Sequence, residues 1–176
     1  MSKFIILDRD GTLNVDEKGY THKVEDFKLH EGVIEGLNLL KGQFKFIIVT
    51  NQSGIGRGYY KKEDFDKFNE RLVEELKKQN ITIEKTYCCP HTKEENCNCR
   101  KPKTEFIDIA KEEFNIDLEH SFMIGDHPCD VNLGKNAGTK TIFLLTGHGQ
   151  KHKEEITNQP DFIANNLLEA ARWILR

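Results

Sequence analysis

Short apolar runs recur along this chain and constrain its fold more than any other feature. Three of them are Phe4–Leu7, Phe46–Val49 and Ile142–Leu145, each bounded by polar residues. Strands that are buried on both faces carry such near-continuous runs, whereas half-exposed strands alternate apolar and polar residues. The runs are separated by segments with apolar residues at helical spacing, as in 60–79. Alternating strands and helices predict a parallel sheet with helices on both faces.

The expected elements follow this alternation along the whole chain. We predict strands at Lys3–Leu7, Phe44–Thr50, Ile83–Cys88, Ser121–Gly125, Thr139–Leu145 and Asp161–Ala164, and helices at Val33–Lys41, Tyr60–Gln79, Glu105–Phe114, Asp130–Asn136 and Leu167–Leu175. No internal repeat and no linker-like segment interrupts the pattern. The sequence therefore predicts a single α/β domain over residues 1–176, with a Rossmann-like parallel sheet.

Charge balance and the length of the apolar runs exclude several classes of function. Lys and Arg number 26 against 29 Asp and Glu, so the chain lacks the basic excess that binds nucleic acid. A membrane span needs about twenty apolar residues, and no run approaches that length. The N-terminus shows no secretory signal pattern. We therefore expect a cytoplasmic monomer. Its expected partner is a small molecule, which can be phosphorylated, and we expect no nucleic-acid or membrane partner.

Acidic residues follow two of the predicted strands at the point where each strand ends, and one of them is Asp126, directly after Ser121–Gly125. Asp8 and Asp10 come directly after the first strand, and because they are two residues apart they leave the same side of an extended chain. Two such carboxylates repel each other unless a cation or a shared proton intervenes. The pattern favours a Mg²⁺ site with one carboxylate as nucleophile. An ordinary turn is the alternative, and a calcium-binding EF-hand loop does not fit because its twelfth position would be Gly19.

Two further segments carry groups that suit an anion. The turn Thr50–Gly56 offers hydroxyls, amides and several backbone N–H groups, and Arg57 follows it. Arg100, Lys101 and Lys103 precede another predicted helix. The alternative for the first segment is an ordinary glycine-bearing turn, and the alternative for the second is a solvated charged turn. Their position at the carboxyl ends of strands, beside the aspartates, favours a phosphate site.

Cysteine and histidine residues crowd into a small loop that we predict binds zinc, at about 88–100. This segment contains five candidate ligands, four cysteines and one histidine, and structural zinc takes four ligands in a closed tetrahedron. Because adjacent side chains at a strand end diverge, we do not expect Cys88 and Cys89 to bind the same ion. We favour Cys89 as the ligand, with Cys88 packed toward the core. The predicted zinc ligands are Cys89, His91, Cys97 and Cys99. The alternative is a set of free thiols with a surface histidine; Cys129 stands apart and is expected to be a packing residue.

Together these residues resemble the four motifs of haloacid dehalogenase-superfamily phosphatases. The matching segments are Asp8-x-Asp10-Gly11-Thr12, Thr50-Asn51-Gln52, Lys101 and Gly125-Asp126-x-x-x-Asp130. The zinc segment, Cys89-Pro90-His91 with Cys97-x-Cys99-Arg100-Lys101-Pro102, is more specific. It resembles the zinc-loop subgroup, which contains phosphatases of heptose bisphosphates and of histidinol phosphate.

The resemblance implies a catalytic role for each motif residue. Asp8 would attack phosphorus to form an aspartyl-phosphate, and Asp10 would protonate the leaving oxygen and then activate water. Thr50 and Lys101 would offset charge on the phosphoryl oxygens. The resemblance further implies Mg²⁺ as catalytic cofactor and Zn²⁺ as structural cofactor. The Mg²⁺ ligands would be the Asp8 side chain, the Asp10 main-chain carbonyl and Asp126, with Asp130 orienting Lys101.

The resemblance also implies a substrate and the residues that bind it. The expected reaction removes the C7 phosphate from D-glycero-D-manno-heptose 1,7-bisphosphate, and histidinol phosphate is the alternative substrate. The enzyme would lack an inserted cap domain, so the zinc loop and the segment 16–22 would shape the pocket. His127 stands where heptose phosphatases commonly carry Lys. The expected substrate-binding residues are Asp16, Gly19, Tyr20, Asn51, Gln52, Ser53, Arg57, Arg100 and His127, with Arg57 and Arg100 gripping the second phosphate.

Overall fold

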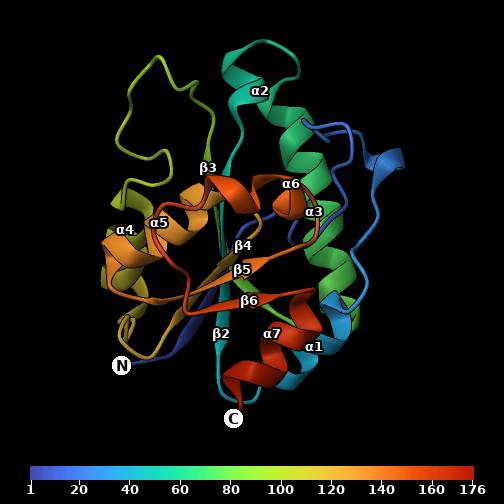
Figure 1. Cartoon of the computed structure of the whole chain (residues 1–176). Helices are drawn as coiled ribbons and strands as arrows, with labels where there is room; N and C mark the ends of the chain where they lie inside the picture. Colours follow the sequence, from blue (N-terminus) through green and yellow to red (C-terminus); the bar gives the residue numbers. More distant parts are fainter.

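The computed structural model describes residues 1–176 and contains one six-stranded sheet. All neighbouring strands run parallel, in the order β3-β2-β1-β4-β5-β6. The strands are β1 (Phe4–Leu7), β2 (Lys45–Asn51), β3 (Ile83–Cys89), β4 (Phe122–Gly125), β5 (Lys140–Leu144) and β6 (Phe162–Ala164). The predicted parallel α/β sheet is therefore confirmed (Figure 1).

Five helices of eight residues or more pack against this sheet. They are α1 (Val33–Leu40), α3 (Lys62–Lys78), α4 (Glu105–Phe114), α5 (Pro128–Ala137) and α7 (Leu167–Ile174). Two four-residue helices, α2 (Ser53–Gly56) and α6 (Gly149–His152), and two 3₁₀ turns, at Val24–Asp26 and Lys153–Glu155, were not expected from the sequence. Segments this short are too brief to establish a helical apolar period, and α2 lies within a glycine-rich turn.

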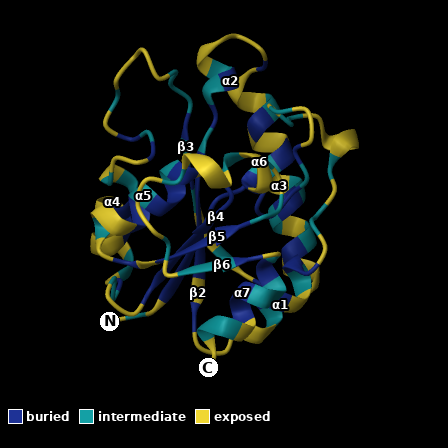
Figure 2. Ribbon diagram, in the orientation of Figure 1, coloured by how far each residue is buried: buried dark blue, intermediate teal, exposed yellow.

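The core lies on both faces of the sheet because alternate strand residues point in opposite directions. On β1, Ile5 and Leu7 pack among side chains of α1, α3 and α7. Phe4 and Ile6 pack on the other face, among side chains of α4 and α5. All four side chains are fully buried, and burial of each contributes about 1.5–3 kcal/mol. Figure 2 shows this buried layer running through the sheet between the two sets of helices.

The strand order places a crevice at the carboxyl ends of β1 and β4. These strands are neighbours, but the chain proceeds from β1 toward β2 and from β4 toward β5, on opposite sides. Loops that diverge from such a reversal leave an open space that parallel α/β proteins use for ligands. The loop after β3 and the α2 turn project from this same edge of the sheet (Figure 1). None of the helices is both long and apolar enough to cross a membrane.

Candidate active site

A cavity of about 300 Å³ opens at the crevice between the strand ends. It brings together most of the predicted site residues, although they come from distant parts of the chain. Its lining comprises Asp8, Asp10, Asp16, Gly19, Tyr20, Thr50, Asn51, Gln52, Tyr60, Arg100, Lys101, Asp126, His127, Cys129 and His148. Of the predicted substrate-binding residues, Ser53 and Arg57 lie outside this lining.

A buried lysine holds two of the aspartates at the floor of the cavity. Lys101 Nζ lies 2.8 Å from Asp8 Oδ1 and 2.7 Å from Asp130 Oδ1. Burial opposes the charge on Lys101, but the carboxylates of Asp130 and Asp8 outweigh it and raise the pKa of Lys101. The pKa of Asp8 is also raised, to about 7, chiefly by burial and against the pull of Lys101. Lys101 therefore pairs with both carboxylates, and the role of Asp130 in orienting Lys101 stays a prediction.

Asp126 adds a third buried carboxylate beside this pair. Oxygens of Asp8, Asp126 and Asp130 all lie within 4.8 Å of one another. Burial, together with the charges of Asp8 and Asp130, raises the pKa of Asp126 to about 8. One lysine does not balance three carboxylates, so the group fits a divalent cation with oxygen ligands. The backbone comes close enough only because residue 11 is glycine: a Cβ at Gly11, where φ is +80°, would lie 2.2 Å from Asp126 Oδ2.

Two hydrogen bonds orient the Asp126 carboxylate from loops after other strands. Thr12 Oγ1 donates to Asp126 Oδ1 at 3.3 Å, and the backbone N–H of His148 donates to Asp126 Oδ2 at 2.8 Å. The His148 ring also lines the cavity, with Nε2 3.8 Å from Asp16 Oδ2. The sequence reasoning missed His148, since a backbone donor in a loop leaves no residue-type signal.

The carboxylate of Asp10 lies in a network of side-chain donors. Gln52 Nε2 donates to Asp10 Oδ2 at 2.6 Å and to Thr50 Oγ1 at 2.8 Å. Tyr60 OH donates to Gln52 Oε1 at 2.6 Å and so fixes the orientation of the amide. Asn14 Nδ2 donates to Asp10 Oδ1 at 3.0 Å. Tyr60 and Asn14 were not among the predicted site residues, and their hydrogen bonds place them in this network.

The segment 16–22 forms one wall of the cavity, as expected. The backbone N–H of Thr21 donates to Asp16 Oδ1 at 3.0 Å, which closes the segment on itself. Tyr20 adopts a left-handed backbone conformation with φ of 62°, and its exposed ring meets Tyr59 edge-on at 5.0 Å. His22 stacks on the Tyr60 ring at 4.5 Å. These aromatic contacts attach the segment to the turn between α2 and α3.

The predicted phosphate-binding arginines occupy different surroundings. Arg100 lines the active-site cavity, and its Nη1 donates to the carbonyl of His91 at 3.1 Å. Arg57 lies beside Glu94, with 3.8 Å between Nη2 and Oε2. An adjoining cavity of about 410 Å³ shares five lining residues with the first and is rich in cations. Its lining comprises Asn51, Lys93, Asn96, Cys97, Arg100, Lys101, Pro102, Lys103, His127 and Cys129.

His127 lines both cavities and caps the N-terminus of α5, directly before Pro128. Its Nδ1 accepts a hydrogen bond from the backbone N–H of Cys129 at 3.3 Å, which requires the unprotonated ring nitrogen. Burial lowers the pKa of His127, and the neighbouring His152 lowers it further. A neutral imidazole at this position would offer Nε2 to a ligand as a hydrogen-bonding group in place of a fixed positive charge.

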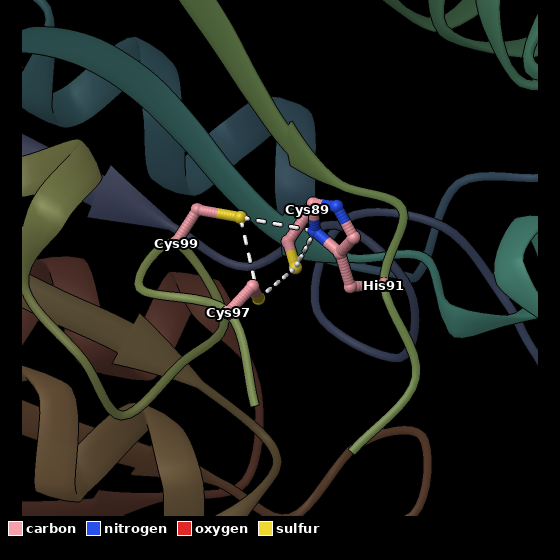
Figure 3. A group of neighbouring side chains, drawn as sticks. All are labelled: Cys89, His91, Cys97 and Cys99. Atoms are coloured by element: carbon pink, nitrogen blue, oxygen red, sulfur yellow. Dashed lines mark hydrogen bonds between the residues drawn. The ribbon is translucent and has the colours of Figure 1, made fainter. Parts of the chain in front are cut away.

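The predicted zinc ligands converge in the loop after β3 (Figure 3). The Sγ atom of Cys89 lies 3.7 Å from His91 Nδ1 and 3.6 Å from Cys97 Sγ. Cys99 Sγ lies 3.4 Å from His91 Nδ1 and 3.5 Å from Cys97 Sγ. A tetrahedral zinc ion separates its ligand atoms by about 3.5–3.8 Å, given bonds of about 2.0–2.3 Å. The four side chains therefore fit a structural zinc ion.

Two other cysteines differ from the expectation. Cys88 is half-buried, and the fully buried strand residue is the neighbouring ligand Cys89. Cys129 is also half-buried, and it lines both cavities instead of serving only as a packing residue. The turn before α5 brings Cys129 to the crevice, which the spacing in the sequence does not show, and its packing role stays a prediction.

Comparisons with known proteins identify relatives over nearly the full length. A family described as HAD-hydrolase-like matches residues 98–170. The D-glycero-beta-D-manno-heptose-1,7-bisphosphate 7-phosphatase of Helicobacter pylori (strain J99) is 42% identical over 175 residues, covering 98% of this chain and 97% of the relative. The D-glycero-alpha-D-manno-heptose-1,7-bisphosphate 7-phosphatase of Campylobacter jejuni is 44% identical over 145 residues, covering 82% and 83%.

Solved structures give the same fold. The D,D-heptose 1,7-bisphosphate phosphatase of B. bronchiseptica, complexed with magnesium and phosphate, superposes with a TM-score of 0.91. It is 24% identical to this chain, and the match covers 98% of both. A HAD-like phosphatase from Mesorhizobium loti has a TM-score of 0.81 and covers 98% of this chain and 87% of its own.

Proposed function

We propose that this chain, which belongs to the family of D-glycero-D-manno-heptose-1,7-bisphosphate 7-phosphatases among the haloacid dehalogenase-like hydrolases, removes the C7 phosphate from that sugar bisphosphate. Its class of reaction is phosphoric monoester hydrolysis. The observation that carries the proposal is the buried group of Asp8, Lys101 and Asp126 at the strand reversal. The two relatives support the substrate, and they do not favour histidinol phosphate, the alternative expected from the sequence.

Asp8 is the proposed nucleophile. Lys101 Nζ and the backbone N–H of Arg9, the latter at 2.7 Å, both bind Asp8 Oδ1 and hold the carboxylate in one orientation. The positive charge of Lys101 favours the ionised carboxylate, which is the form that attacks phosphorus. The Asp8–phosphorus bond forms as the bond from phosphorus to the sugar oxygen breaks. Lys101 and Thr50 then face the phosphoryl oxygens and offset their charge.

Asp10 is the proposed acid and base. It lines the same cavity as Asp8, so it can reach the oxygen that leaves. Asp10 donates a proton to that oxygen and afterwards accepts a proton from the water that hydrolyses the aspartyl-phosphate. Its hydrogen bond from Gln52 also connects it to Thr50.

We propose Mg²⁺ for the acidic group and Zn²⁺ for the cysteine loop. The carboxylates of Asp8 and Asp126, with the main-chain carbonyl of Asp10, would hold Mg²⁺. The presence of magnesium in the B. bronchiseptica structure supports this choice. When bound, the ion would offset negative charge on the phosphoryl group. The zinc ligands would be Cys89, His91, Cys97 and Cys99, and their role would be structural because four ligands leave no open position.

The two adjoining cavities suit a substrate with a phosphate at each end. One phosphate would reach Asp8, while the second would lie near Arg100, which lines both cavities. A guanidinium group pairs with phosphate through two N–H donors. We also propose substrate contacts for Asp16, Gly19, Tyr20, Asn51, Gln52 and His127. Ser53 and Arg57 lie outside both linings, so their contact with substrate stays a prediction.

The test of this function is the release of inorganic phosphate from three substrates. They are the alpha and beta anomers of heptose 1,7-bisphosphate and histidinol phosphate. We expect kcat/KM for the preferred anomer to exceed that for histidinol phosphate at least about hundredfold, roughly 2.7 kcal/mol, because a second phosphate adds binding energy that orients the reacting end. Phosphorus NMR should show that the C1 phosphate remains on the sugar. Equal or better activity on histidinol phosphate would overturn the substrate.

The remaining expectations concern the location, the oligomeric state and the partners of the enzyme. A cytoplasmic location, a monomeric state and the lack of nucleic-acid or membrane partners stay predictions from the sequence. Size-exclusion chromatography with light scattering would measure the oligomeric state directly.

A further inference from the structure

Arg9 is a fully buried cation between the two catalytic aspartates, and none of the roles above uses its side chain. Its guanidinium carbon lies 4.8 Å from the centroids of both the Phe65 and Phe68 rings of α3. A charged group is costly to bury, and a buried ion pair replaced as a whole by apolar side chains of similar volume is often no less stable. A packing role alone therefore does not account for an arginine at this position.

The guanidinium group of Arg9 is directed at the Asp10 carboxylate. Nε donates to Asp10 Oδ1 at 3.0 Å, and Nη2 donates to Asp10 Oδ2 at 2.9 Å. This two-point contact fixes the plane of the carboxylate as well as its position, which a lysine ammonium group cannot do. With the donors Asn14 and Gln52, each Asp10 oxygen accepts two hydrogen bonds from protein side chains.

Two further contacts fix the guanidinium group itself. Nη2 of Arg9 donates to the carbonyl of Thr21 at 3.1 Å and contacts Gln52 Oε1 at 3.4 Å. Thr21 belongs to the segment 16–22 that forms one wall of the cavity. Arg9 is therefore held by α3, by this wall and by the loop after β2, and Asp10 takes its position from all three.

We propose that Arg9 is a positioning residue that aims the Asp10 carboxylate at the leaving oxygen of the substrate. The inference rests on the acid–base role of Asp10 under the proposed function. Arg9 touches neither the substrate nor the reacting phosphorus, so its removal should affect the proton transfer more than binding. Proton donation matters for an alkoxide leaving group such as a sugar oxygen, and matters little for p-nitrophenolate, which leaves unprotonated.

The experiment compares two leaving groups in the same enzyme preparation. For Arg9→Lys and Arg9→Gln, kcat on heptose 1,7-bisphosphate is measured beside the first-turnover release of p-nitrophenol from p-nitrophenyl phosphate. The matched control is Arg71→Gln, because Arg71 is also an arginine stacked on a phenylalanine, with its guanidinium carbon 5.3 Å from the Phe27 ring, and it lies away from the cavity. The ratio of the two rates does not depend on the fraction of folded enzyme, so partial misfolding cannot imitate the effect.

We expect kcat on the bisphosphate to fall at least about thirtyfold in both Arg9 variants, because misplacing Asp10 forfeits part of an acid–base contribution of about 10²–10⁴-fold. Release of p-nitrophenol should stay within about threefold of wild type, KM should change less than about threefold, and Arg71→Gln should leave the ratio unchanged. An equal fall on both substrates, or wild-type kcat in Arg9→Lys, would overturn the inference. Where Arg9→Gln does not fold, Arg9→Lys decides the outcome.

Asp10→Asn in the same assay separates this inference from the proposed function. If Asp10→Asn lowers bisphosphate turnover selectively and Arg9→Lys does not, the positioning role of Arg9 is wrong and the function stands. If Asp10→Asn lowers both rates equally, the acid–base role of Asp10 itself is wrong, and the inference about Arg9 falls with it.

Discussion

Lys101 Nζ lies 2.8 Å from Asp8 Oδ1, although one residue follows the first strand of the chain and the other follows the cysteine loop. The contact depends on Asn51 at the end of β2. Asn51 Oδ1 accepts from the Lys101 backbone N–H at 3.0 Å, and Asn51 Nδ2 donates to the Lys101 carbonyl at 3.3 Å. Three strand ends thus fix one ion pair, and the cysteine loop positions a proposed catalytic lysine.

Replacing Lys101 should affect both catalysis and stability. Lys101→Met removes the cation that faces the phosphoryl group, and kcat should fall about 10²–10³-fold. Because Asp8 and Asp130 then stay buried without their partner, the free energy of unfolding of the metal-free protein should fall by about 3–5 kcal/mol. Urea unfolding in EDTA measures this change.

The control for that experiment is Lys85→Met. Lys85 pairs with Glu113 at the surface, with side chains 41% and 40% exposed, so its loss should cost about 0–1 kcal/mol. Equal destabilisation by both substitutions would contradict the account of Lys101.

The zinc proposal predicts a link between metal content and stability. Cys97→Ser should lose about one equivalent of zinc and lower the melting temperature, because the binding free energy of a structural metal is folding free energy. Elemental analysis and thermal unfolding measure the two effects. Cys88→Ser is the matched control, since Cys88 adjoins the ligand Cys89 but is not part of the cluster. A wild-type protein without zinc and with an unchanged melting temperature after Cys97→Ser would refute the site.

Mg²⁺ should stabilise the protein more at high pH than at low pH. Burial raises the pKa of Asp8 to about 7 and that of Asp126 to about 8, whereas both are near 3.9 in the unfolded chain. From about pH 4 up to these values the folded state binds more protons than the unfolded state. The stability contributed by these groups therefore falls as pH rises through this window in the absence of metal.

A cation that binds the ionised carboxylates offsets this penalty. The rise in melting temperature on adding Mg²⁺ should consequently be larger at about pH 8.5 than at about pH 5.5, as scanning fluorimetry with an EDTA reference would show. An equal rise at both pH values would mean that Asp8 and Asp126 are not the groups that bind the ion.

Replacing Arg100 and replacing Arg57 by alanine should lower kcat/KM for the bisphosphate to different extents. Arg100 lines both cavities, whereas Arg57 lines neither. Arg100→Ala should therefore lower kcat/KM about 10- to 100-fold, as expected for the loss of about 1.4–2.7 kcal/mol of charged hydrogen bonds. Arg57→Ala should lower it less than Arg100→Ala does, because Arg57 lies outside both linings. Steady-state kinetics on the purified variants decides the order, and a larger loss in Arg57→Ala would move the second phosphate site toward α2.

The sequence predicted the strands and the convergence of the motif residues for physical reasons. Strands buried on both faces need continuous apolar runs, and residues directly after parallel strands meet at one edge of the sheet. Asp8, Asp126 and the zinc ligands were therefore identifiable from position and residue type. Their chemistry also restricts the choice, because buried carboxylates and clustered thiols both call for a cation.

Other residues could not be predicted because tertiary packing sets their role. Arg9 follows a strand and has the residue type of an exposed charge, but the Phe65 and Phe68 rings enclose it. His148 acts on Asp126 through its backbone, which any residue except proline could do. Arg57 follows the short α2 and lies outside both cavity linings, so its contact with the second phosphate stays a prediction.

The most direct test of the central claim is to trap the phosphoenzyme. Heptose 1,7-bisphosphate labelled with ³²P at C7 is mixed with wild-type enzyme and Mg²⁺ and quenched in acid within milliseconds, and the labelled peptide is sequenced. We predict label on Asp8, sensitive to hydroxylamine, and none in Asp8→Asn, which should retain less than a few per cent of wild-type turnover because an amide cannot form the intermediate. Label on another residue, or full turnover by Asp8→Asn, would contradict the account.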